Sequence, residues 1–462
     1  MTHELRPYPE YKDSGLPWLG EIPAHWEEKR AKYFYREVNE RSQTGEEELL
    51  SVSHVTGVTP RSQKNVTMFK AESYVGSKLC HAGDLVINTM WAWMAALGVA
   101  RQTGIVSPAY GVYRPRHSNA FMPDFVDHLL RTQPYASEYF CRSTGIRKSR
   151  LRLYPEKFLE IPIVCPPIEE QRQIVAYLTA KDHIIRRFIR NRRLVIELLN
   201  EQKRAITSRA VTRGIDAAVR VKASGINWLG DVPEHWEVTR IKNEFHCLNH
   251  RRVPLNSVER GTMTKHEYDY YGASGVIDKV DDYLFDDDLL LIAEDGANLV
   301  LRNLPLAIIA RGKFWVNNHA HILKPKRGNI EYLAGFLETL NYRPWITGAA
   351  QPKLTQDRLM SISICVASPE EQGDIVAHID EATAPLRTAI VRAEREIGLL
   401  REHRTRLTAD VVTGKVDVRH LALEALTPSP EDLEPLDNGE VLDDELQEDE
   451  DLEAVEEVAD AD

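Results

Sequence analysis

Two long stretches of the chain carry apolar side chains at intervals of three and four residues, with charged side chains between them. These positions are Ile174, Leu178, Ile185, Phe188, Val195, Leu199 and Ile206 in the first stretch, and Ile379, Ala382, Leu386, Ala389, Ala393, Ile397, Leu400 and Leu407 in the second. Because the spacing approximates 3.5 residues per turn, it predicts two long helices packed lengthwise on each other. The alternative is a pair of core helices in separate domains.

Proline and glycine delimit both stretches. Pro167 and Pro369 precede them, and Gly214 and Gly414 follow them, as is typical of helix starts and ends. Pro385 lies inside the second stretch and predicts a kink or a short lead-in helix there. About 40 residues at 1.5 Å each would give a rod of about 60 Å.

The segments before each predicted helix have mixed α/β character. GDLVIN (83–88) and DDLLLIAEDG (287–296) are apolar runs led by aspartate, which predict strands that end in turns. Short helical patterns follow at 124–131 and 331–340. The pattern therefore predicts an α+β fold with two α/β blocks and two long helices.

The chain also repeats itself. SGLPWLGEIPAHWE (14–27) returns as SGINWLGDVPEHWE (224–237), 210 positions later, with nine identical residues. EEQRQIVAYL from Glu169 returns as EEQGDIVAHI from Glu370, 201 positions later. The order is thus repeated phrase, variable block and long helix, twice over. The variable blocks themselves, roughly 28–165 and 238–366, resemble each other little.

Each copy of the phrase carries two tryptophans, Trp18 and Trp26 in the first and Trp228 and Trp236 in the second. We expect these side chains to act as an aromatic brace that pins the chain to a neighbouring element. The repeats predict five segments: a first variable domain (1–165), a first long helix (166–213), a second variable domain (214–366), a second long helix (367–426) and an acidic disordered tail (427–462).

Charge separates the tail from the body. The net charge is −12, but residues 427–462 hold 17 Asp and Glu and no Lys or Arg. Without them, 58 basic residues face 53 acidic ones, a net charge of +5. The tail is either a polyanion that competes with nucleic acid for the basic body or a solubilising end. Five scattered cysteines, no signal peptide and no apolar run of membrane length predict a cytoplasmic protein without a membrane partner.

Signatures of catalysis are missing from the sequence. It has no GxGxxG after a strand, no GxxxxGK[ST] and no [DN]PP[YF], so we expect neither a cofactor site nor catalytic residues on this chain. His319 and His321 alternate on a predicted strand and would form half of a metal site, but no matching ligand cluster is evident, so we expect no metal. Asp286, Asp287 and Asp288 predict a turn and a strand start.

Basic and amide side chains in loops of both blocks suggest binding to DNA, because Arg and Lys bind phosphates and guanine while Asn and Gln bind adenine edges. The loops are PRSQKN (60–65), GIRKSR (145–150), NHRR (249–252) and AAQPKL (349–354). The candidate DNA-binding residues are Arg61, Lys64, Asn65, Arg147, Lys148, Arg150, Arg251, Arg252, Asn298, Asn318, Gln351 and Lys353.

Taken together, residues 12–420 resemble the DNA-specificity subunit of type I restriction–modification systems. WLGxxPxHW and EEQxxIVA open the phrase and the helix of each half, and LNEQKRAITSRAVTRGI (199–215) and LREHRTRLTADVVTGKV (400–416) look like that family's helix ends. YYGASGVIDKVDDYLFDDDLLLIAEDGAN (270–298) and VNNHAHIL (316–323) resemble one common type of target-recognition domain. GDLVINTMW and GIVSPAYGVY (104–113) resemble another type. The acidic tail departs from the family's usual pattern.

The resemblance implies a non-catalytic subunit in which each block reads one half of a split DNA site. The two helices would pack antiparallel with a pseudo-twofold axis, separate the blocks, and dock two modification (methyltransferase) subunits. S-adenosylmethionine would be bound by those partners, and restriction/translocase subunits would complete the complex. Three alternatives stay open: a stand-alone DNA-binding regulator, a coiled-coil scaffold that binds proteins, and a hydrolase that uses His319 and His321.

Overall fold

The computed structural model describes residues 5–63, 73–117, 119–146, 150–296, 298–302, 304–348 and 352–421. The chain divides into two compact units. The first unit contains Met1–Arg193 and Glu394–Asp462, and the second contains Leu194–Ala393. Both units therefore take part of each long helix, and each unit also holds one of the two variable blocks.

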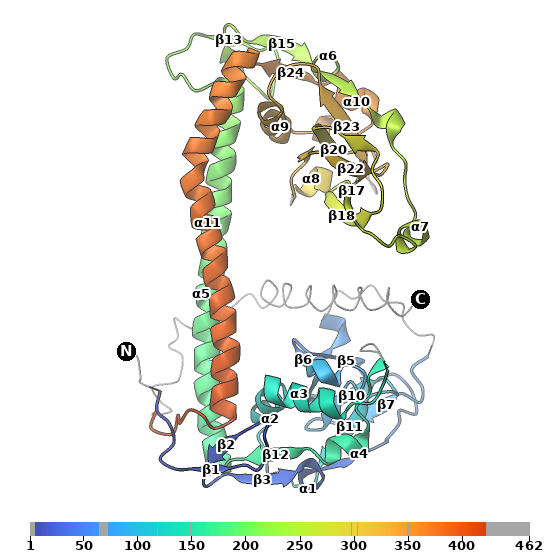
Figure 1. Ribbon diagram of the computed structural model, residues 1–462, viewed down its shortest axis with the longest axis vertical. Helices are drawn as coiled ribbons and strands as arrows, with labels where there is room; N and C mark the ends of the chain where they lie inside the picture. The colour runs from blue at the N-terminus through green and yellow to red at the C-terminus, as the bar shows by residue number, and fades with distance from the viewer. Residues whose placement is uncertain are drawn as a thin grey trace. The chain divides into compact units, whose positions relative to one another are not determined.

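The two long helices are α5 (Ile168–Arg213, 46 residues) and α11 (Pro369–Val412, 44 residues). They lie side by side in each unit (Figure 1). In the first unit Asp182 of α5 forms an ion pair with Arg404 of α11 (3.6 Å), and Arg192 forms one with Glu396. The later residue of α5 thus pairs with the earlier residue of α11, which confirms the expected antiparallel packing.

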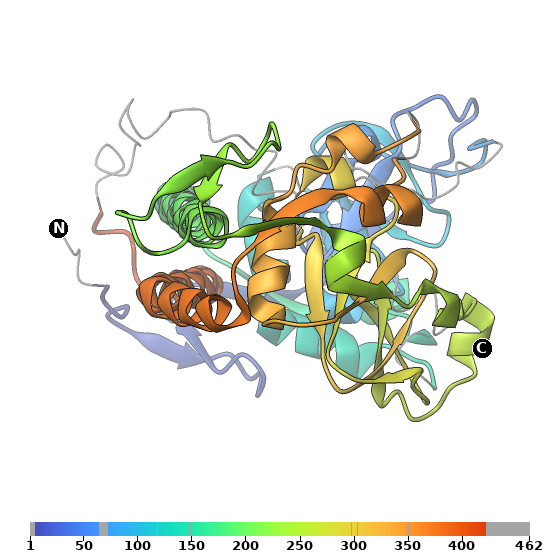
Figure 2. The same cartoon turned by 90° about the horizontal axis from the view of Figure 1, so that it is seen from above.

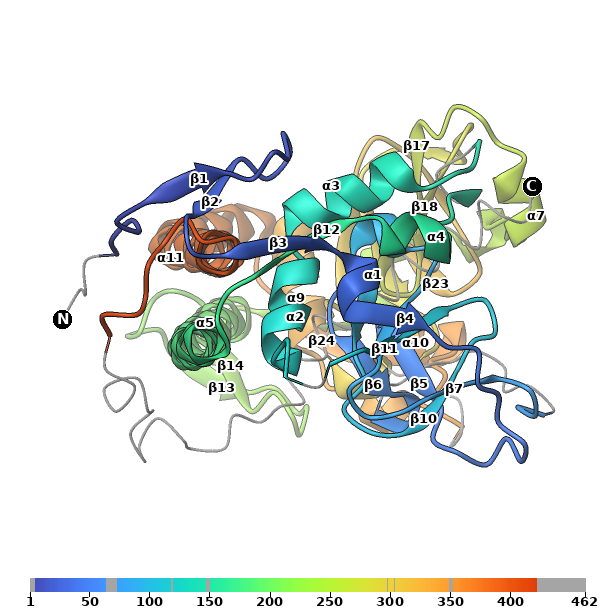
Figure 3. The same cartoon turned by 90° about the horizontal axis from the view of Figure 1, so that it is seen from below.

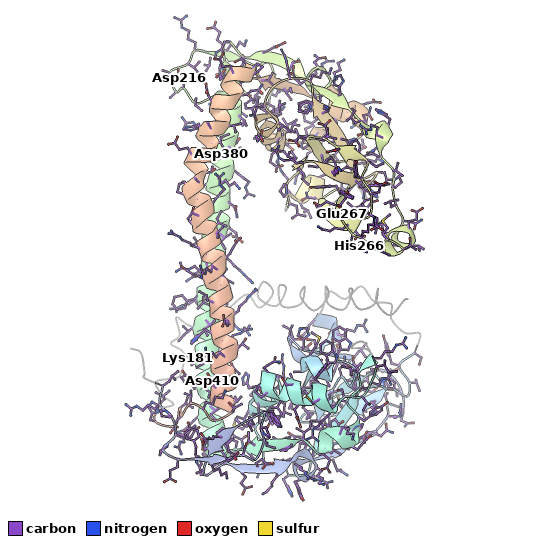
Figure 4. All side chains as sticks on the ribbon, in the orientation of Figure 1. Lys181, Asp216, His266, Glu267, Asp380 and Asp410 are labelled. Carbon is purple, nitrogen blue, oxygen red and sulfur yellow. The ribbon has the colours of Figure 1, made fainter. Side chains whose placement is uncertain are left out.

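The second unit contains the same pairing of helices. Ala210 and Val211, near the end of α5, belong to one buried cluster with Ile375, near the start of α11. Figure 4 shows the matching situation in the first unit, where Lys181 of α5 and Asp410 of α11 lie at the same level. The apolar spacing of the sequence is therefore a seam between two helices, and the alternative of core helices in separate domains is wrong. Two positions assigned to the seam from the sequence are not buried in it, because Phe188 is 48% exposed and Val195 is 39% exposed.

Pro385 lies within α11, which continues through it as one helix. A separate lead-in helix, one of the two expected outcomes, does not form. Proline removes one backbone hydrogen bond and disfavours a helix interior by about 3 kcal/mol. The carbonyl that loses its partner is that of Glu381, and side chains bond the two carbonyls before it: Thr383 Oγ1 donates to Ile379 O (2.7 Å), and Arg387 Nη2 donates to the carbonyl of Asp380 (3.1 Å).

Each variable block is built on a four-stranded antiparallel sheet. In the first unit the strand order is β4-β11-β8-β9, and in the second it is β16-β23-β20-β21. The first sheet comprises β4 (Tyr35–Glu37), β8 (Leu85–Ile87), β9 (Leu97–Val99) and β11 (Gly111–Pro115). The second comprises β16 (Phe245–Cys247), β20 (Leu289–Ala293), β21 (Ala307–Ala310) and β23 (Ala320–Pro325). When the four strands are numbered along the chain, both sheets have the order 1-4-2-3. Two blocks with little sequence likeness therefore share one topology.

Two strand pairs flank each sheet in the same way. They are β1 (Tyr11–Asp13) with β2 (Glu21–Pro23) and β3 (Glu27–Arg30) with β12 (Pro162–Cys165) in the first unit, and β13 (Val221–Ala223) with β14 (Asp231–Pro233) and β15 (Glu237–Arg240) with β24 (Ser363–Val366) in the second. The β1–β2 pair lies beside the end of α11 (Figure 3), and the β13–β14 pair lies beside the end of α5 (Figure 2). The repeated phrase supplies β2 and β14.

The units differ in their additional strands. The first unit adds the two-stranded pairs β5 (Leu50–Ser53) with β6 (Gly57–Pro60) and β7 (Lys78–Cys80) with β10 (Gly104–Val106). The second adds one sheet of order β18-β17-β22-β19, formed by β17 (Tyr268–Gly272), β18 (Gly275–Val280), β19 (Phe285–Asp286) and β22 (Lys313–Val316). These additions distinguish the two blocks.

Short helices complete both units. The first has α1 (Ala31–Phe34), η1 (Arg61–Gln63), η2 (Ala92–Met94), α2 (Pro123–Leu130), α3 (Gln133–Arg142) and α4 (Pro155–Leu159). The second has α6 (Ile241–Glu244), η4 (Asn249–Arg251), α7 (Ser257–Gly261), α8 (Asn298–Leu301), α9 (Ile330–Thr339), η5 (Arg343–Trp345) and α10 (Gln356–Ser361). The helices predicted at 124–131 and 331–340 are α2 and α9, and the predicted strands at 83–88 and 287–296 contain β8 and β20.

Candidate nucleic-acid interface

The repeated phrase binds the start of a long helix in each unit. In the first unit the carboxylate of Glu170 accepts hydrogen bonds from Trp26 Nε1 (3.0 Å) and Tyr8 Oη (2.6 Å) and contacts His25 Nε2 (2.7 Å). Burial and this carboxylate hold the pKa of Tyr8 far above its usual range, so Tyr8 remains a donor. We name this contact the Glu170 clamp.

The second unit repeats the contact at the matching residues. Glu371 accepts from Trp236 Nε1 (3.0 Å) and contacts His235 Nε2 (2.8 Å). The next residue of each helix, Gln171 or Gln372, accepts from the backbone N–H that begins α2 or α9, at Met122 or Asn329 (2.8 Å each). The expected bracing role of the phrase is confirmed, and the signature EEQ is the other half of that brace.

In the first unit three loops meet at one end of the sheet. They comprise residues 88–91 after β8, 107–110 before β11, and 144–153 after α3, of which 147–149 lie outside the described residues. Thr89 Oγ1 donates to the carbonyl of Ala109 (2.9 Å), and the N–H of Leu153 donates to the carbonyl of Thr89 (2.9 Å). Thr144 and Arg152 close the third loop with two backbone hydrogen bonds of 3.0 Å. We call these loops the first loop cluster.

The second unit builds the same arrangement. Its loops comprise residues 294–296 after β20, 317–319 before β23, and the described residues of 347–354. The N–H of Glu294 donates to the carbonyl of His319 (2.8 Å), and the N–H of Leu354 donates to the carbonyl of Glu294 (2.7 Å). Thr347 and Lys353 close the third loop through backbone bonds of 2.9 and 2.8 Å. We call these loops the second loop cluster.

The third loop of the first cluster is equivalent to the third loop of the second cluster. GIRKSR follows Thr144 in the first cluster, and AAQPKL lies within 347–354 of the second. Both are closed by the same pair of backbone bonds and both touch the strand-end residue of their sheet. The closing residues Arg152 and Lys353 lie 201 positions apart, the same separation as Glu169 and Glu370, so this end of each loop does carry a signal in the sequence.

Charged side chains gather in the second loop cluster around Glu294. Arg252 forms an ion pair with Glu294 and also donates to the carbonyls of Asn318 (3.1 Å) and Ala320 (2.9 Å). Lys353 Nζ lies 3.3 Å from Glu294. Burial alone would raise the pKa of Glu294, but the hydrogen bond from Arg252 and the neighbouring positive charges hold it below its ordinary value. Glu294 is therefore an ionised centre that fixes two of the candidate cations.

The two histidines of NNHAHIL have different environments. His321 is fully buried; its Nδ1 accepts from Asn249 Nδ2 (2.8 Å), and its Nε2 donates to the carbonyl of Leu354 (2.7 Å). Burial lowers the pKa of His321, so the ring is neutral. His319 is half-exposed, and its Nδ1 lies 2.9 and 3.0 Å from the two carboxylate oxygens of Asp295. The sequence suggested these histidines only as half of a metal site or as hydrolase residues.

The candidate residues of the first unit lie in two loops. Arg61 begins η1 after β6, and Arg150 is exposed in the loop that Thr144 and Arg152 close. Within the described ranges neither side chain has a hydrogen-bond or ion-pair partner, so both are free to bind an external anion. The other first-block candidates, Lys64, Asn65, Arg147 and Lys148, lie outside the described residues.

The candidates of the second unit serve different purposes. Asn318 is exposed in the second loop cluster, and Lys353 is half-exposed beside it. Arg251 donates to the carbonyl of Leu284 (3.0 Å) and covers the ring of Phe285, while Asn298 bonds both the N–H (2.9 Å) and the carbonyl (3.1 Å) of Leu304. Arg251, Arg252 and Asn298 thus already support loops of the unit. Gln351 lies outside the described residues.

Two further observations bear on chemistry. Among the described residues, no group of three or more His, Cys, Asp or Glu side chains is placed to hold a metal ion. Asp287 and Asp288 form ion pairs with Lys324 and Arg311 at the turn into β20, as expected for a turn and strand start. Along the parts of the chain that the structure describes, no helix is both long and apolar enough to cross a membrane.

Comparison with known proteins identifies relatives of one kind. A family model described as the type I restriction modification DNA specificity domain matches residues 233–394. The putative type I restriction enzyme specificity subunit S.HindORF215P of Haemophilus influenzae is 34% identical over 139 residues. That match covers 30% of this chain and 34% of the relative, so the aligned part spans about a third of the relative's length.

Two other likenesses extend over more of the chain. The putative type I restriction enzyme MjaX specificity subunit of Methanocaldococcus jannaschii is 25% identical over 334 residues, which cover 66% of this chain and 70% of that protein. A chain solved in a study of complex assembly and conformational transition of the type I R-M system superposes with a TM-score of 0.53. It is 15% identical, and the superposition covers 85% of this chain and 98% of that one. At this identity the likeness shows the fold alone.

Proposed function

Because the chain belongs to the family of DNA-specificity subunits of type I restriction–modification systems, we propose that each of its two units reads one half of a split DNA target. The first loop cluster reads one half-site and the second loop cluster reads the other. Different loop chemistry on the two sheets would give an asymmetric target with a gap between its halves.

One observation carries this proposal. The described ends of the loops that carry GIRKSR and AAQPKL are closed by matching backbone bonds, Thr144 with Arg152 and Thr347 with Lys353, although the two variable blocks have little likeness. A protein with one binding site would need no second copy of this arrangement. A duplicated scaffold that carries two different loop sets suits a ligand with two different parts, as a gapped DNA site has.

The long helices would dock two modification subunits. Each unit exposes an apolar i,i+4 pair on α5, Ile184 with Phe188 in the first and Leu194 with Leu198 in the second, where helical neighbours share a face. Leu399 on α11 of the first unit is 55% exposed and Val391 on α11 of the second is 63% exposed. In each unit the i,i+4 pair forms a contiguous apolar patch, and contiguous exposed patches mark interaction surfaces. One such surface in each unit matches a complex with two methyltransferase subunits.

Catalysis would belong to the partners. The sequence lacks the glycine-rich and NPP[YF]-type motifs that bind S-adenosylmethionine and the target adenine, so the methyltransferase subunits bind that cofactor in our proposal. Restriction/translocase subunits complete the assembly where they are present. The chain itself contributes recognition and the mounting of its partners.

The test is sequencing of methylated adenines in cells that express a methyltransferase partner with or without this chain. We expect methylation at a two-part motif only when both proteins are present, and no methylation or cleavage of DNA by the purified chain alone. Methyl transfer by the isolated chain, or a partner whose motif is unchanged when this chain is absent, would contradict the proposal.

A further inference from the structure

The second loop cluster presents one histidine ring in a fixed orientation. His319 accepts at its backbone carbonyl from the N–H of Glu294 (2.8 Å), and its own N–H donates to Asn317 Oδ1 (2.8 Å). Its Nδ1 is held by both oxygens of Asp295, whose side chain is 15% exposed, while the ring itself is 49% exposed. Backbone and ring are therefore both positioned, and the free edge of the ring is the one that carries Nε2.

The bond to Asp295 sets the hydrogen-bonding character of that edge. A carboxylate only accepts hydrogen bonds, so Nδ1 of His319 must carry the proton. In the neutral ring Nε2 is then an acceptor. His321, two residues away, has the opposite arrangement, since its Nδ1 accepts and its Nε2 donates within the core. The buried His321 is thus the tautomer with its proton on Nε2, and the half-exposed His319 is the tautomer with its proton on Nδ1.

The surroundings of His319 suit contact with DNA. Asn318, the preceding residue, is exposed, and the backbone of Asp295 forms a β-bridge with Lys353, whose side chain is half-exposed. Arg252 and Lys353 offset the charge of Glu294, the residue before Asp295. Among the described residues, Nε2 of His319 has no hydrogen-bond partner of its own. A free acceptor in such a place is available to a ligand.

We propose that His319 is a specificity-determining residue of the second half-site, with Asp295 as its positioning residue. The inference rests on the proposed function and names the chemistry that this site reads. In the major groove the donors on base edges are the N6 amino group of adenine and the N4 amino group of cytosine. Nε2 of His319 accepts from one of these amino groups, so one position of the second half-site is adenine or cytosine on the strand that His319 contacts.

The experiment uses the assembled complex with its methyltransferase partner and compares His319→Ala, Asp295→Asn and His246→Ala. His246 lies on β16 of the same unit, is exposed, and is not part of the loop cluster, so it is the matched control. The readouts are the two-part motif from sequencing of methylated adenines and binding of purified complex to a duplex library.

We expect His319→Ala to lose discrimination at one position of the second half-site by about 5- to 100-fold, the range of a single mismatch. Asp295→Asn should admit guanine there, because an amide can donate to Nδ1 and leave Nε2–H as a donor. The first half-site and the His246→Ala motif should stay unchanged. An unaltered second half-site in His319→Ala would overturn this inference and leave the two-part motif standing. A wild-type complex that has no two-part motif would instead overturn the proposed function.

Discussion

The first and second units share one strand order and one type of clamp, and they differ in the side chains of their loop clusters. Both order their strands alike, both tie a tryptophan and a histidine to a glutamate at a helix start, and both close a loop with a pair of backbone bonds. The first loop cluster offers half-buried Met90, Trp91 and Tyr110, whereas the second offers Glu294, Asp295, His319 and Lys353, with Arg252 bound to Glu294 from outside it. The sheet and the clamp are thus common to both halves of the duplication, and the side chains of the loop clusters differ.

The clamps themselves differ in strength, and the difference gives the largest expected effect. Glu170 has three partners and a side chain that is 4% exposed, while Glu371 has two partners and is 25% exposed. Glu170→Ala leaves Tyr8 Oη and Trp26 Nε1 buried without a partner. We expect it to lower the free energy of unfolding of the first unit by about 3–5 kcal/mol, and Glu371→Ala to lower that of the second by about 1–2 kcal/mol.

Hydrogen exchange measured along the chain during urea titration would separate the two units. Peptides of the first unit should lose protection in Glu170→Ala and peptides of the second unit in Glu371→Ala, the former at lower urea. Equal losses in both variants would show that the extra partner and deeper burial of Glu170 contribute nothing.

The glycines that end the long helices give the next largest contrast. Both have a positive φ, +82° at Gly414 and +75° at Gly214, which disfavours alanine by about 1 kcal/mol. A Cβ on Gly414 would lie 2.4 Å from Pro23 Cδ, whereas one on Gly214 would have no neighbour nearer than 3.6 Å. We expect Gly414→Ala to cost about 2–4 kcal/mol and Gly214→Ala about 1 kcal/mol, measured by thermal or urea unfolding. A larger loss in Gly214→Ala would contradict the packing described for the phrase.

His321 gives the second unit an acid sensitivity. Its pKa is lower in the folded protein than in the unfolded chain because burial disfavours the charged ring. The unfolded state therefore binds more protons, and stability that is present above the unfolded pKa of about 6.5 is lost as pH falls toward the folded pKa. Unfolding between pH 7.5 and 5 should show this loss in the wild type and a weaker loss in His321→Gln. His128 of the first unit, whose pKa burial also lowers, stays in place as the internal comparison.

The smallest contrast concerns the exposed cations. Arg150 has no ion-pair partner among the described residues, whereas Lys353 forms an ion pair with Glu294. Removing one cation that binds a phosphate lowers the slope of log affinity against log salt by about 0.9. Arg150→Gln should approach that value and Lys353→Gln should fall below it, because Lys353 is partly neutralised before DNA binds. An unchanged slope in Arg150→Gln would place this loop away from phosphate.

The sequence was informative where a pattern repeats. The apolar seam predicted α5 and α11, and the repeated phrase predicted a brace, since both copies carry their two tryptophans at the same positions. Continuity through Pro385 was not predicted, because proline disfavours a helix interior and the packing of α11 against α5 appears only in the fold.

Other features depend on contacts that no local pattern encodes. The common strand order arises from pairings such as β11 with β4 and β23 with β16, which join residues far apart in two dissimilar blocks. The orientation of His319 depends on Asp295, and its difference from His321 depends on Asn249 and Leu354. Residue types suggested chemistry at these positions, and only the fold assigns each side chain to the core or to the surface.

The central claim is that two units on one framework read two independent half-sites. Exchanging residues 238–366 for the corresponding block of another specificity subunit, followed by sequencing of methylated adenines in cells with the methyltransferase partner, tests it most directly. We predict that one half of the motif changes and the other half stays identical. If both halves change, or neither does, the units do not read DNA separately and the account is wrong.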